Sequence, residues 1–233
     1  DGQTPLHLAI LYGDEEIAIS LINNGANLGI QDQYDLTPLI YAISENKTQA
    51  ALAIIDKLTD ADIQSDQGYT QIVTAISEGE KDIVLALVDR GIDIYLKKSA
   101  GTTSLHSAID SNNTEISLAL IKKVDNVNLE DQVGFTPLYL AVDSHNTGIV
   151  LALLDKGANL NLNNNLYKET PLHLAIVRGL TEIALALIDK GANLDIQDNE
   201  QGHTPLHQAI IYNRTGIAIA LIEKGANLDI QDE

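Results

Sequence analysis

The chain has 233 residues, of which 45% are hydrophobic and 20% are charged, and it contains no cysteine. Its 14 Lys and Arg residues are outnumbered by 33 Asp and Glu residues, which gives a formal net charge of -19 at pH 7. This composition excludes disulfides, thiolate catalysis and cysteine-based zinc sites, and the negative charge disfavours nucleic acid and anionic membrane surfaces as partners.

A heptad that begins with Thr recurs along the chain, and its first copy reads Thr-Pro-Leu-His-Leu-Ala-Ile over residues 4–10. The Thr residues of the copies lie at positions 4, 37, 70, 103, 136, 170 and 204, so the period is 33 or 34 residues. Internal repeats of this length predict a stack of similar units, each of which buries its apolar face against its neighbours. We place the starts of seven units near residues 1, 33, 66, 99, 132, 165 and 199.

Each unit is predicted to contain two short helices. Thr suits the N-cap of the first helix, and Pro suits its first turn, where a missing N–H is harmless. After this helix comes a column of residues that tolerate a left-handed backbone: Gly13, Asn46, Gly79, Asn112, His145, Gly179 and Asn213. A second helix and a polar stretch suited to a hairpin complete the unit.

The Thr-Pro-Leu-His-x-Ala pattern with a period near 33 resembles the ankyrin repeat, and the resemblance covers the whole chain. It implies an all-α repeat solenoid of stacked helix–turn–helix units with projecting β-hairpin loops, in a single domain over residues 1–233. It also implies a protein-binding scaffold with no catalytic activity, no cofactor and no metal.

The sequence departs from the ankyrin pattern at several turn positions. Gln71 and Ser104 stand where Pro is expected, and Asp35 and Lys168 replace the hairpin Gly. The second helix normally ends in Gly, but Leu58 and Val124 occupy that position in two units. We expect local differences in turn geometry there, within an unchanged fold.

Two columns differ from copy to copy: the residue before each Thr, at the hairpin tip, and the residue eight positions after it, at the end of the first helix. In a repetitive core, packing does not dictate such columns, and the resemblance places them on the concave face that ankyrin proteins use for partners. Aromatic residues gather there, and such residues anchor interfaces. The predicted partner-binding residues are Tyr12, Tyr34, Leu36, Tyr69, Glu78, Phe135, Tyr167, Arg178, His203 and Tyr212. The alternative is that the aromatic residues only stiffen the hairpins.

The partner is expected to be another protein, and the acidic charge favours one with a basic segment. The alternative function is a structural spacer that links catalytic or targeting domains outside this segment. We expect a monomer rather than an oligomer, in the cytoplasm, with the host-cell cytosol as the alternative for an exported protein. Both end units carry the apolar pattern of interior units, and the chain does not begin with Met. From this we expect a fragment of a longer protein with further repeats or capping helices.

The histidines are interpreted as structural. His7, His106, His173 and His207 share one heptad position, from which the ring can bond the neighbouring Thr hydroxyl or a backbone group and tie unit to unit. Other copies carry Ile40, Val73 and Tyr139 there, so the column is no row of metal ligands.

The fifteenth residue after each Thr is always aliphatic (Ile19, Leu52, Leu85, Leu118, Leu151, Leu185 and Ile219), and small residues mostly follow it. We expect this row to pack laterally between units, with an exposed row for self-association or a second partner as the alternative.

The resemblance also implies that hairpin Asn residues can be hydroxylated by an iron-dependent oxygenase, and Asn128 and Asn161 hold the matching position.

Overall fold

The structure is a computed structural model that describes residues 2–60, 66–97 and 100–233. Its described residues contain helices and no strand, and the chain divides into two compact units, Asp1–Leu96 and Lys97–Glu233. The helices of the first unit are α1 (Pro5–Tyr12), α2 (Glu15–Asn23), α3 (Pro38–Ser44), α4 (Thr48–Lys57), α6 (Asp66–Glu78) and α7 (Lys81–Asp89). Those of the second are α8 (Ser104–Asp110), α9 (Thr114–Lys123), α10 (Pro137–Asp143), α11 (Thr147–Asp155), α12 (Pro171–Arg178), α13 (Thr181–Asp189), α14 (Pro205–Ile211) and α15 (Thr215–Glu223).

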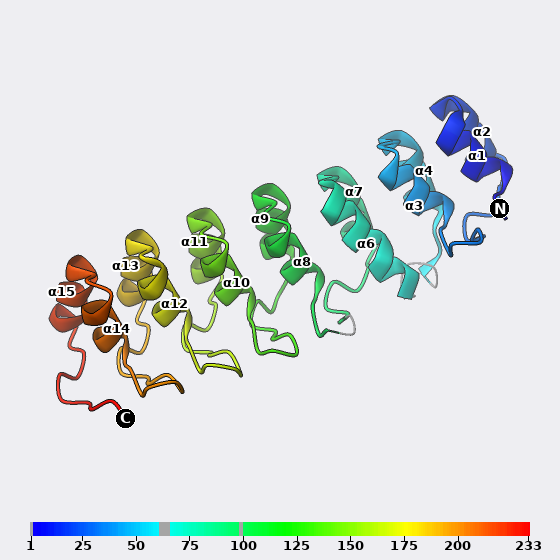
Figure 1. The fold of residues 1–233 in the computed structure, drawn as a ribbon. Helices are drawn as coiled ribbons and strands as arrows, with labels where there is room; N and C mark the ends of the chain where they lie inside the picture. Colours follow the sequence, from blue (N-terminus) through cyan, green and yellow to red (C-terminus); the bar gives the residue numbers. More distant parts are fainter. Residues whose placement is uncertain (1, 61–65, 98–99) are drawn as a thin grey trace. The chain divides into compact units, whose positions relative to one another are not determined.

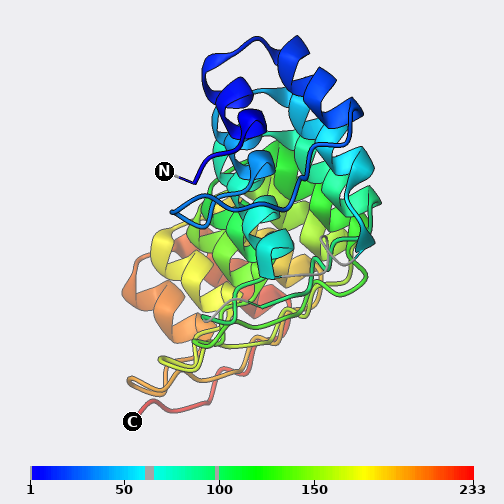
Figure 2. The same cartoon turned by 90° about the vertical axis from the view of Figure 1, so that its right-hand side faces the viewer.

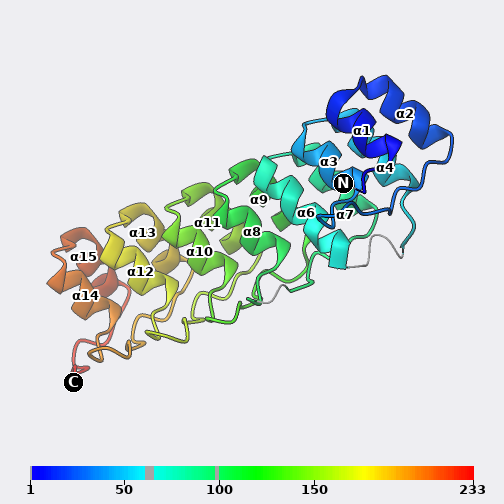
Figure 3. The same ribbon diagram turned by 45° about the vertical axis from the view of Figure 1, so that its right-hand side comes forward.

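Within each unit the helices form two layers. In the second unit the first helices α8, α10, α12 and α14 pack side by side, and the second helices α9, α11, α13 and α15 form the layer behind them (Figure 3). The first unit repeats this order with α1, α3 and α6 in one layer and α2, α4 and α7 in the other (Figure 1). The all-α repeat solenoid predicted from the sequence is therefore confirmed.

In every repeat except that of α6, the Thr column starts the first helix, as predicted. Thr4 has an extended backbone, and its hydroxyl accepts the backbone N–H of His7 at 3.4 Å, while Pro5 occupies the first turn. In return the Nδ1 atom of His7 accepts the backbone N–H of Thr4 at 3.1 Å. This reciprocal capping satisfies two backbone donors that a helix start otherwise leaves unpaired.

The histidine rings also tie neighbouring repeats together. Because Nδ1 accepts a hydrogen bond, Nε2 carries the hydrogen and can donate it. The Nε2 atom of His7 lies 3.2 Å from the carbonyl oxygen of Leu36, His106 Nε2 lies 3.1 Å from that of Phe135, and His173 Nε2 lies 3.3 Å from that of His203. The structural interpretation of this column is confirmed.

The turn between the two helices has the predicted left-handed backbone at Asn46, Gly79, Asn112, His145, Gly179 and Asn213. Gly13 is the exception, with φ of -100° and ψ of -178°. A Cβ atom on Gly13 would lie 2.6 Å from the carbonyl oxygen of Ala9, so this backbone conformation leaves no room for a side chain.

The substituted turn positions adapt in two ways. Asp35 and Lys168 keep the left-handed conformation of the glycine they replace, with φ of 60° and 55°. Leu58 and Val124 do not: both are buried, their backbone is extended, and α4 and α9 end there without a left-handed residue.

The prediction that Tyr69 lies at an exposed hairpin tip is wrong. Tyr69 lies inside α6, and only 5% of its surface is exposed. A Pro disfavours helical backbone at the residue before it, and Gln71 removes that restriction from Thr70. Val73 also removes the His that would cap the helix at Thr70, so the helix extends back to Asp66.

Replacement of the Pro alone does not lengthen a first helix. Ser104 likewise replaces Pro, but His106 is present and its Nδ1 atom accepts the backbone N–H of Thr103 at 3.2 Å. Helix α8 accordingly begins at Ser104. Only the repeat of α6 lacks both the Pro and the His.

The predicted β-hairpins are tight loops closed by backbone hydrogen bonds rather than paired strands. The backbone N–H of Asp32 donates to the carbonyl of Leu36 at 3.0 Å, and that of Asp131 donates to the carbonyl of Phe135 at 3.0 Å. In the second unit these loops run alongside one another on the same side of the helices (Figure 2). Residues 61–65 and 98–99, where two further hairpins were expected, lie outside the described residues.

Candidate binding face

A carboxylate or amide holds each described hairpin tip in place. Asp131 Oδ1 accepts the backbone N–H groups of Val133 and Phe135 at 2.9 and 2.8 Å. Asp198 Oδ1 accepts those of Gln201 and His203 at 3.2 and 3.1 Å. Asp32 and Asn164 occupy the same place in their loops. These side chains fix the backbone from which the tip residues project, as is usual for Asp and Asn in turns.

The first helix provides a second anchor for the hairpin that precedes it. The hydroxyl of Tyr41 donates to Asp32 Oδ2 at 2.8 Å, and Gln208 Nε2 donates to Asp198 Oδ2 at 3.0 Å. Burial raises the pKa of Asp198, but its hydrogen bonds outweigh this and hold the pKa below the usual value. The carboxylate therefore stays ionised, and both of its oxygens can accept hydrogen bonds. An Asp or Asn five or six residues before the Thr marks this column in the sequence, but the column was not among the predicted site residues.

Side chains of the hairpin tips contact the first helices of neighbouring repeats. Gln3 Nε2 donates to the hydroxyl of Tyr41 at 2.8 Å, and the hydroxyl of Tyr139 donates to Glu169 Oε2 at 3.2 Å. The tips and the first helices thus form one surface within each unit, which we call the hairpin–helix face.

In the first unit, most of the predicted residues on this face are open to solvent. Tyr12 and Tyr34 are 80% and 68% exposed, Glu78 is exposed, and Leu36 is half-buried. Such exposure of large aromatic side chains is expected where packing does not require them. Tyr69 is the predicted residue that the structure removes from the face.

In the second unit, two of the predicted residues take part in ring stacking on the face. The ring of the half-buried Phe135 stacks on that of Tyr139 with centroids 4.9 Å apart. His203, also half-buried, stacks on His207 and lies 3.7 Å from a carboxylate oxygen of Asp232. Tyr167 and Tyr212, exposed by 48% and 45%, complete the set together with Arg178.

Several carboxylates of the second unit lie close enough to affect one another's pKa. Desolvation raises the pKa of Asp110, at the end of α8, and the charges of Asp131 and Asp143 raise it further. Burial likewise raises the pKa of Glu169, which the charges of Asp198 and Glu200 also raise and the hydroxyl of Tyr139 lowers. Like charges that shift one another in this way are close enough to repel.

The acidic residues on the first helices were not among the predicted site residues. Asp110 and Asp143 are seven residues after their Thr, and the corresponding residues of other copies are uncharged. The only sign of them in the sequence is that an Asp recurs after 33 residues in two adjacent repeats. Arg178 opposes this charge with its guanidinium 2.8 Å from a carboxylate oxygen of Asp143.

The aliphatic row of the second helices is not part of the core. Ile19, Leu52, Leu85 and Leu118 are half-buried, whereas Leu151, Leu185 and Ile219 are 41%, 36% and 51% exposed. The predicted pairing of a large with a small residue is present, since Leu118 and Ala152 line one shallow hollow of about 410 Å³. The expected lateral burial is nevertheless wrong for the three exposed members.

The two Asn residues expected to be hydroxylation sites link neighbouring loops. Asn128 Oδ1 accepts the backbone N–H of Asn159 at 2.7 Å, and Asn161 Oδ1 accepts that of Asn193 at 2.8 Å. Asn128 is half-buried and Asn161 is exposed. Their hydroxylation stays a prediction.

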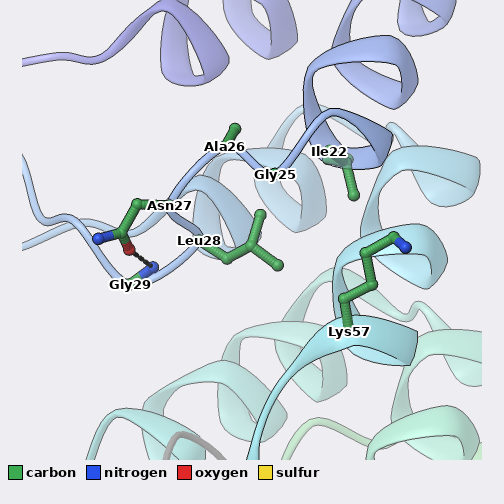
Figure 4. A pocket seen from close by; sticks show the side chains of 7 residues that line it. All are labelled: Ile22, Gly25, Ala26, Asn27, Leu28, Gly29 and Lys57. Carbon is green, nitrogen blue, oxygen red and sulfur yellow. Dashed lines mark hydrogen bonds between the residues drawn. The ribbon is translucent and has the colours of Figure 1, made fainter.

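A hollow of about 310 Å³ lies in the first unit beside the end of α2 (Figure 4). Ile22 and Leu28 supply apolar surface, and Lys57 is the charged residue of the lining. Asn27 turns back to accept the backbone N–H of Gly29 at 3.0 Å. This lining offers no nucleophile paired with a base, and it contributes nothing to the hairpin–helix face.

Across the described ranges, no three His, Asp or Glu side chains are grouped so that they could hold a metal ion. In the same ranges, no helix is both long and apolar enough to cross a membrane.

Comparison with known families agrees with the fold. A family model described as "Ankyrin repeats (3 copies)" matches residues 6–98, 72–164 and 156–232, and no curated protein matches the chain. The chain belongs to the ankyrin-repeat family. Members of this family are generally non-enzymatic modules for protein–protein interaction.

Proposed function

We propose that the chain is a non-enzymatic scaffold that binds a Lys- and Arg-rich segment of another protein on the hairpin–helix face of the unit Lys97–Glu233. The observation that carries this proposal is the grouping of Asp110 with Asp131 and Asp143: burial raises the pKa of Asp110, and the charges of the other two carboxylates raise it further. A cationic side chain placed among these groups relieves their repulsion, and this relief exists only in the complex.

The aromatic residues supply the second part of the interaction. The Phe135–Tyr139 stack lies next to this acidic group, because the backbone of Phe135 is held by Asp131. Aromatic rings bury a large area at a small cost in side-chain entropy, and they also attract the charge of Lys and Arg. Tyr167, Tyr212 and His203 extend this surface along the unit, and Arg178 selects against a basic group at its own position.

The exposed residues Tyr12, Tyr34 and Glu78, together with the half-buried Leu36, give the unit Asp1–Leu96 a comparable surface. Glu78 is the one charged residue of this set, so we assign the unit mainly apolar contacts with the same partner. The concave shape of the hairpin–helix face that the ankyrin resemblance implies is part of this proposal for each unit by itself.

The test is affinity capture from a cell lysate followed by mass spectrometry. The face variant Asp110→Lys/Asp143→Lys is compared with the wild type and with Glu182→Lys/Glu223→Lys, which makes the same change in charge at exposed residues of second helices. We expect proteins with basic segments to be captured by the wild type and the control, and lost from the face variant. Capture of the same proteins by all three chains would contradict the proposal.

A further inference from the structure

An apolar hollow of about 410 Å³ lies in the unit Lys97–Glu233 between α9 and α11, which are neighbours in the layer of second helices (Figure 1). Its lining consists of three apolar residues, Leu118, Ile121 and Ala152, and three charged residues, Lys122, Asp155 and Lys156. The hairpin–helix face is built from the loops and the first helices, so this hollow is a separate surface.

Lys122 reverses the charge that most repeats carry at its position. The residues at the same place in the other copies, nineteen positions after the heptad Thr, are Asn23, Asp56, Asp89, Asp155, Asp189 and Glu223. Packing does not require a lysine here, because the side chain of Lys122 is exposed. Lys122 therefore changes the charge of this surface without a structural need for it.

The charge reversal also removes the ion-pair partner of Lys156. In the next repeat, the carboxylate of Asp155 pairs with Lys190 at 2.8 Å, and α13 and α15 are joined in the same way. Lys156 meets Lys122 instead, and its Nζ donates to the backbone carbonyl of Lys122 at 3.3 Å. Within the described residues, neither of these two lysines forms an ion pair.

The acidic character of the whole chain does not cancel this local positive charge. Asp155 is the carboxylate of the lining, and Lys190 already neutralises it. More distant carboxylates contribute little, since exposed charges are screened beyond about 8 Å at physiological salt. An ammonium has three N–H donors, so Lys122 and Lys156 can both still bind an anionic group.

The unit Asp1–Leu96 contains an equivalent hollow without the excess positive charge. It lies between α4 and α7, has a volume of about 260 Å³, and is lined by Leu52, Ile55, Asp56, Ala86, Asp89 and Arg90. Its two carboxylates and one guanidinium sum to -1, whereas the two ammonium groups and one carboxylate of the other hollow sum to +1. The apolar residues are alike in the two hollows, so the sign of the charge distinguishes them.

We propose that the hollow between α9 and α11 binds an acidic amphipathic segment of a second partner protein. A large apolar side chain of this segment enters the hollow against Leu118 and Ala152, and an Asp or Glu within one helical turn of it binds Lys122 and Lys156. The site goes beyond the proposed function, because it lies on the other layer of the unit and selects the opposite charge.

The test is a selection of random peptides displayed on phage against the immobilised 233-residue chain, followed by fluorescence anisotropy with the enriched peptides. The soluble variant Lys122→Asp is present in excess during the selection and removes peptides that bind elsewhere. This variant keeps the fold, because it restores the carboxylate of the other repeats and gives Lys156 a partner. Ala152→Leu fills the hollow without a change in charge. The matched control Lys123→Asp makes the same change in charge at the next residue of α9, which is exposed and lies outside the lining.

We expect the enriched peptides to carry Asp or Glu within one helical turn of a large apolar residue. Lys122→Asp and Ala152→Leu should each weaken their binding at least about tenfold, and Lys123→Asp should change it by less than about twofold. A Lys- and Arg-rich peptide, which the proposed function places on the hairpin–helix face, should bind all four chains alike. Failure to enrich acidic amphipathic peptides, or equal binding of the enriched peptides to all four chains, would overturn the proposal and leave the proposed function untouched.

Discussion

The guanidinium of Arg178, at the end of α12, donates a hydrogen bond of 2.8 Å to a carboxylate oxygen of Asp143, at the end of α10. This pair joins successive first helices on the hairpin–helix face, and both side chains are about half exposed. It neutralises one carboxylate of the acidic group, whereas Asp110 and Asp131 form no ion pair within the part of the chain that the structure describes.

Replacement Arg178→Ala should separate binding from stability. An exposed ion pair contributes about 0–1 kcal/mol, so the free energy of unfolding should fall by no more than that. The affinity for a short Lys- and Arg-rich peptide should rise, because the released Asp143 joins the acidic group. Urea unfolding and fluorescence anisotropy with the labelled peptide measure the two effects, and a loss of peptide affinity would exclude the proposed charge complementarity.

Replacement Tyr69→Ala should damage folding rather than recognition. Truncation of a buried aromatic side chain costs about 3–5 kcal/mol, whereas Tyr34→Ala, at a side chain that is mostly exposed, should change the free energy of unfolding by less than about 0.5 kcal/mol. Chemical unfolding of the two variants measures this difference. Equal stabilities would show that Tyr69 is not buried in α6.

The buried histidines should make stability depend on pH. Burial lowers the pKa of His106 and of His173 below the usual 6.5, despite hydrogen bonds that raise it. As pH falls below about 6.5, the unfolded chain therefore binds protons that the folded chain excludes, and the free energy of unfolding falls until the folded pKa is reached. The contribution of the neutral rings is complete above this range.

This effect is measured by urea unfolding at about pH 7.5 and about pH 5.5, in the wild type and in His106→Gln/His173→Gln. We expect the wild type to lose more free energy of unfolding between the two pH values than the variant. The raised pKa values of Asp110 and Glu169 act equally in both chains and cancel in the comparison. The same loss in both chains would rule out these histidines as its origin.

Replacement Lys168→Gly should stabilise the chain. Lys168 has φ of 55°, a conformation that glycine adopts without steric strain, although glycine is also freer in the unfolded chain. We expect a net gain of about 0.5 kcal/mol. Lys156→Gly is the control, because Lys156 has ordinary helical backbone at a helix end, and a gain of the same size there would contradict the explanation.

Much of the fold could be predicted from the sequence because each repeat restates the same local signals. The Thr and Pro at the start of α1, and the left-handed Asn46 and Asn112 after α3 and α8, depend on neighbouring residues alone. α6 could not be predicted in this way, because its start depends on the simultaneous loss of the Pro and the His.

The candidate face was predictable only in part for a similar reason. Variation between copies identified Phe135 and Arg178, since it marks columns that packing leaves free. The role of Asp131 was missed because its backbone partners become visible only when the loop is folded. The solvent exposure of Leu151 and Ile219 could not be predicted, because an aliphatic side chain is buried only where neighbouring residues cover it.

Hydrogen–deuterium exchange of the chain, alone and in complex with a captured partner, locates the binding surface on the backbone. On binding, we expect slower exchange in the hairpin loops around Asp131 and Asp198 and at the ends of α8 and α10, with the backbone of α11 and α13 unchanged. Protection confined to α11 and α13, with the loops unaffected, would contradict the proposed binding face.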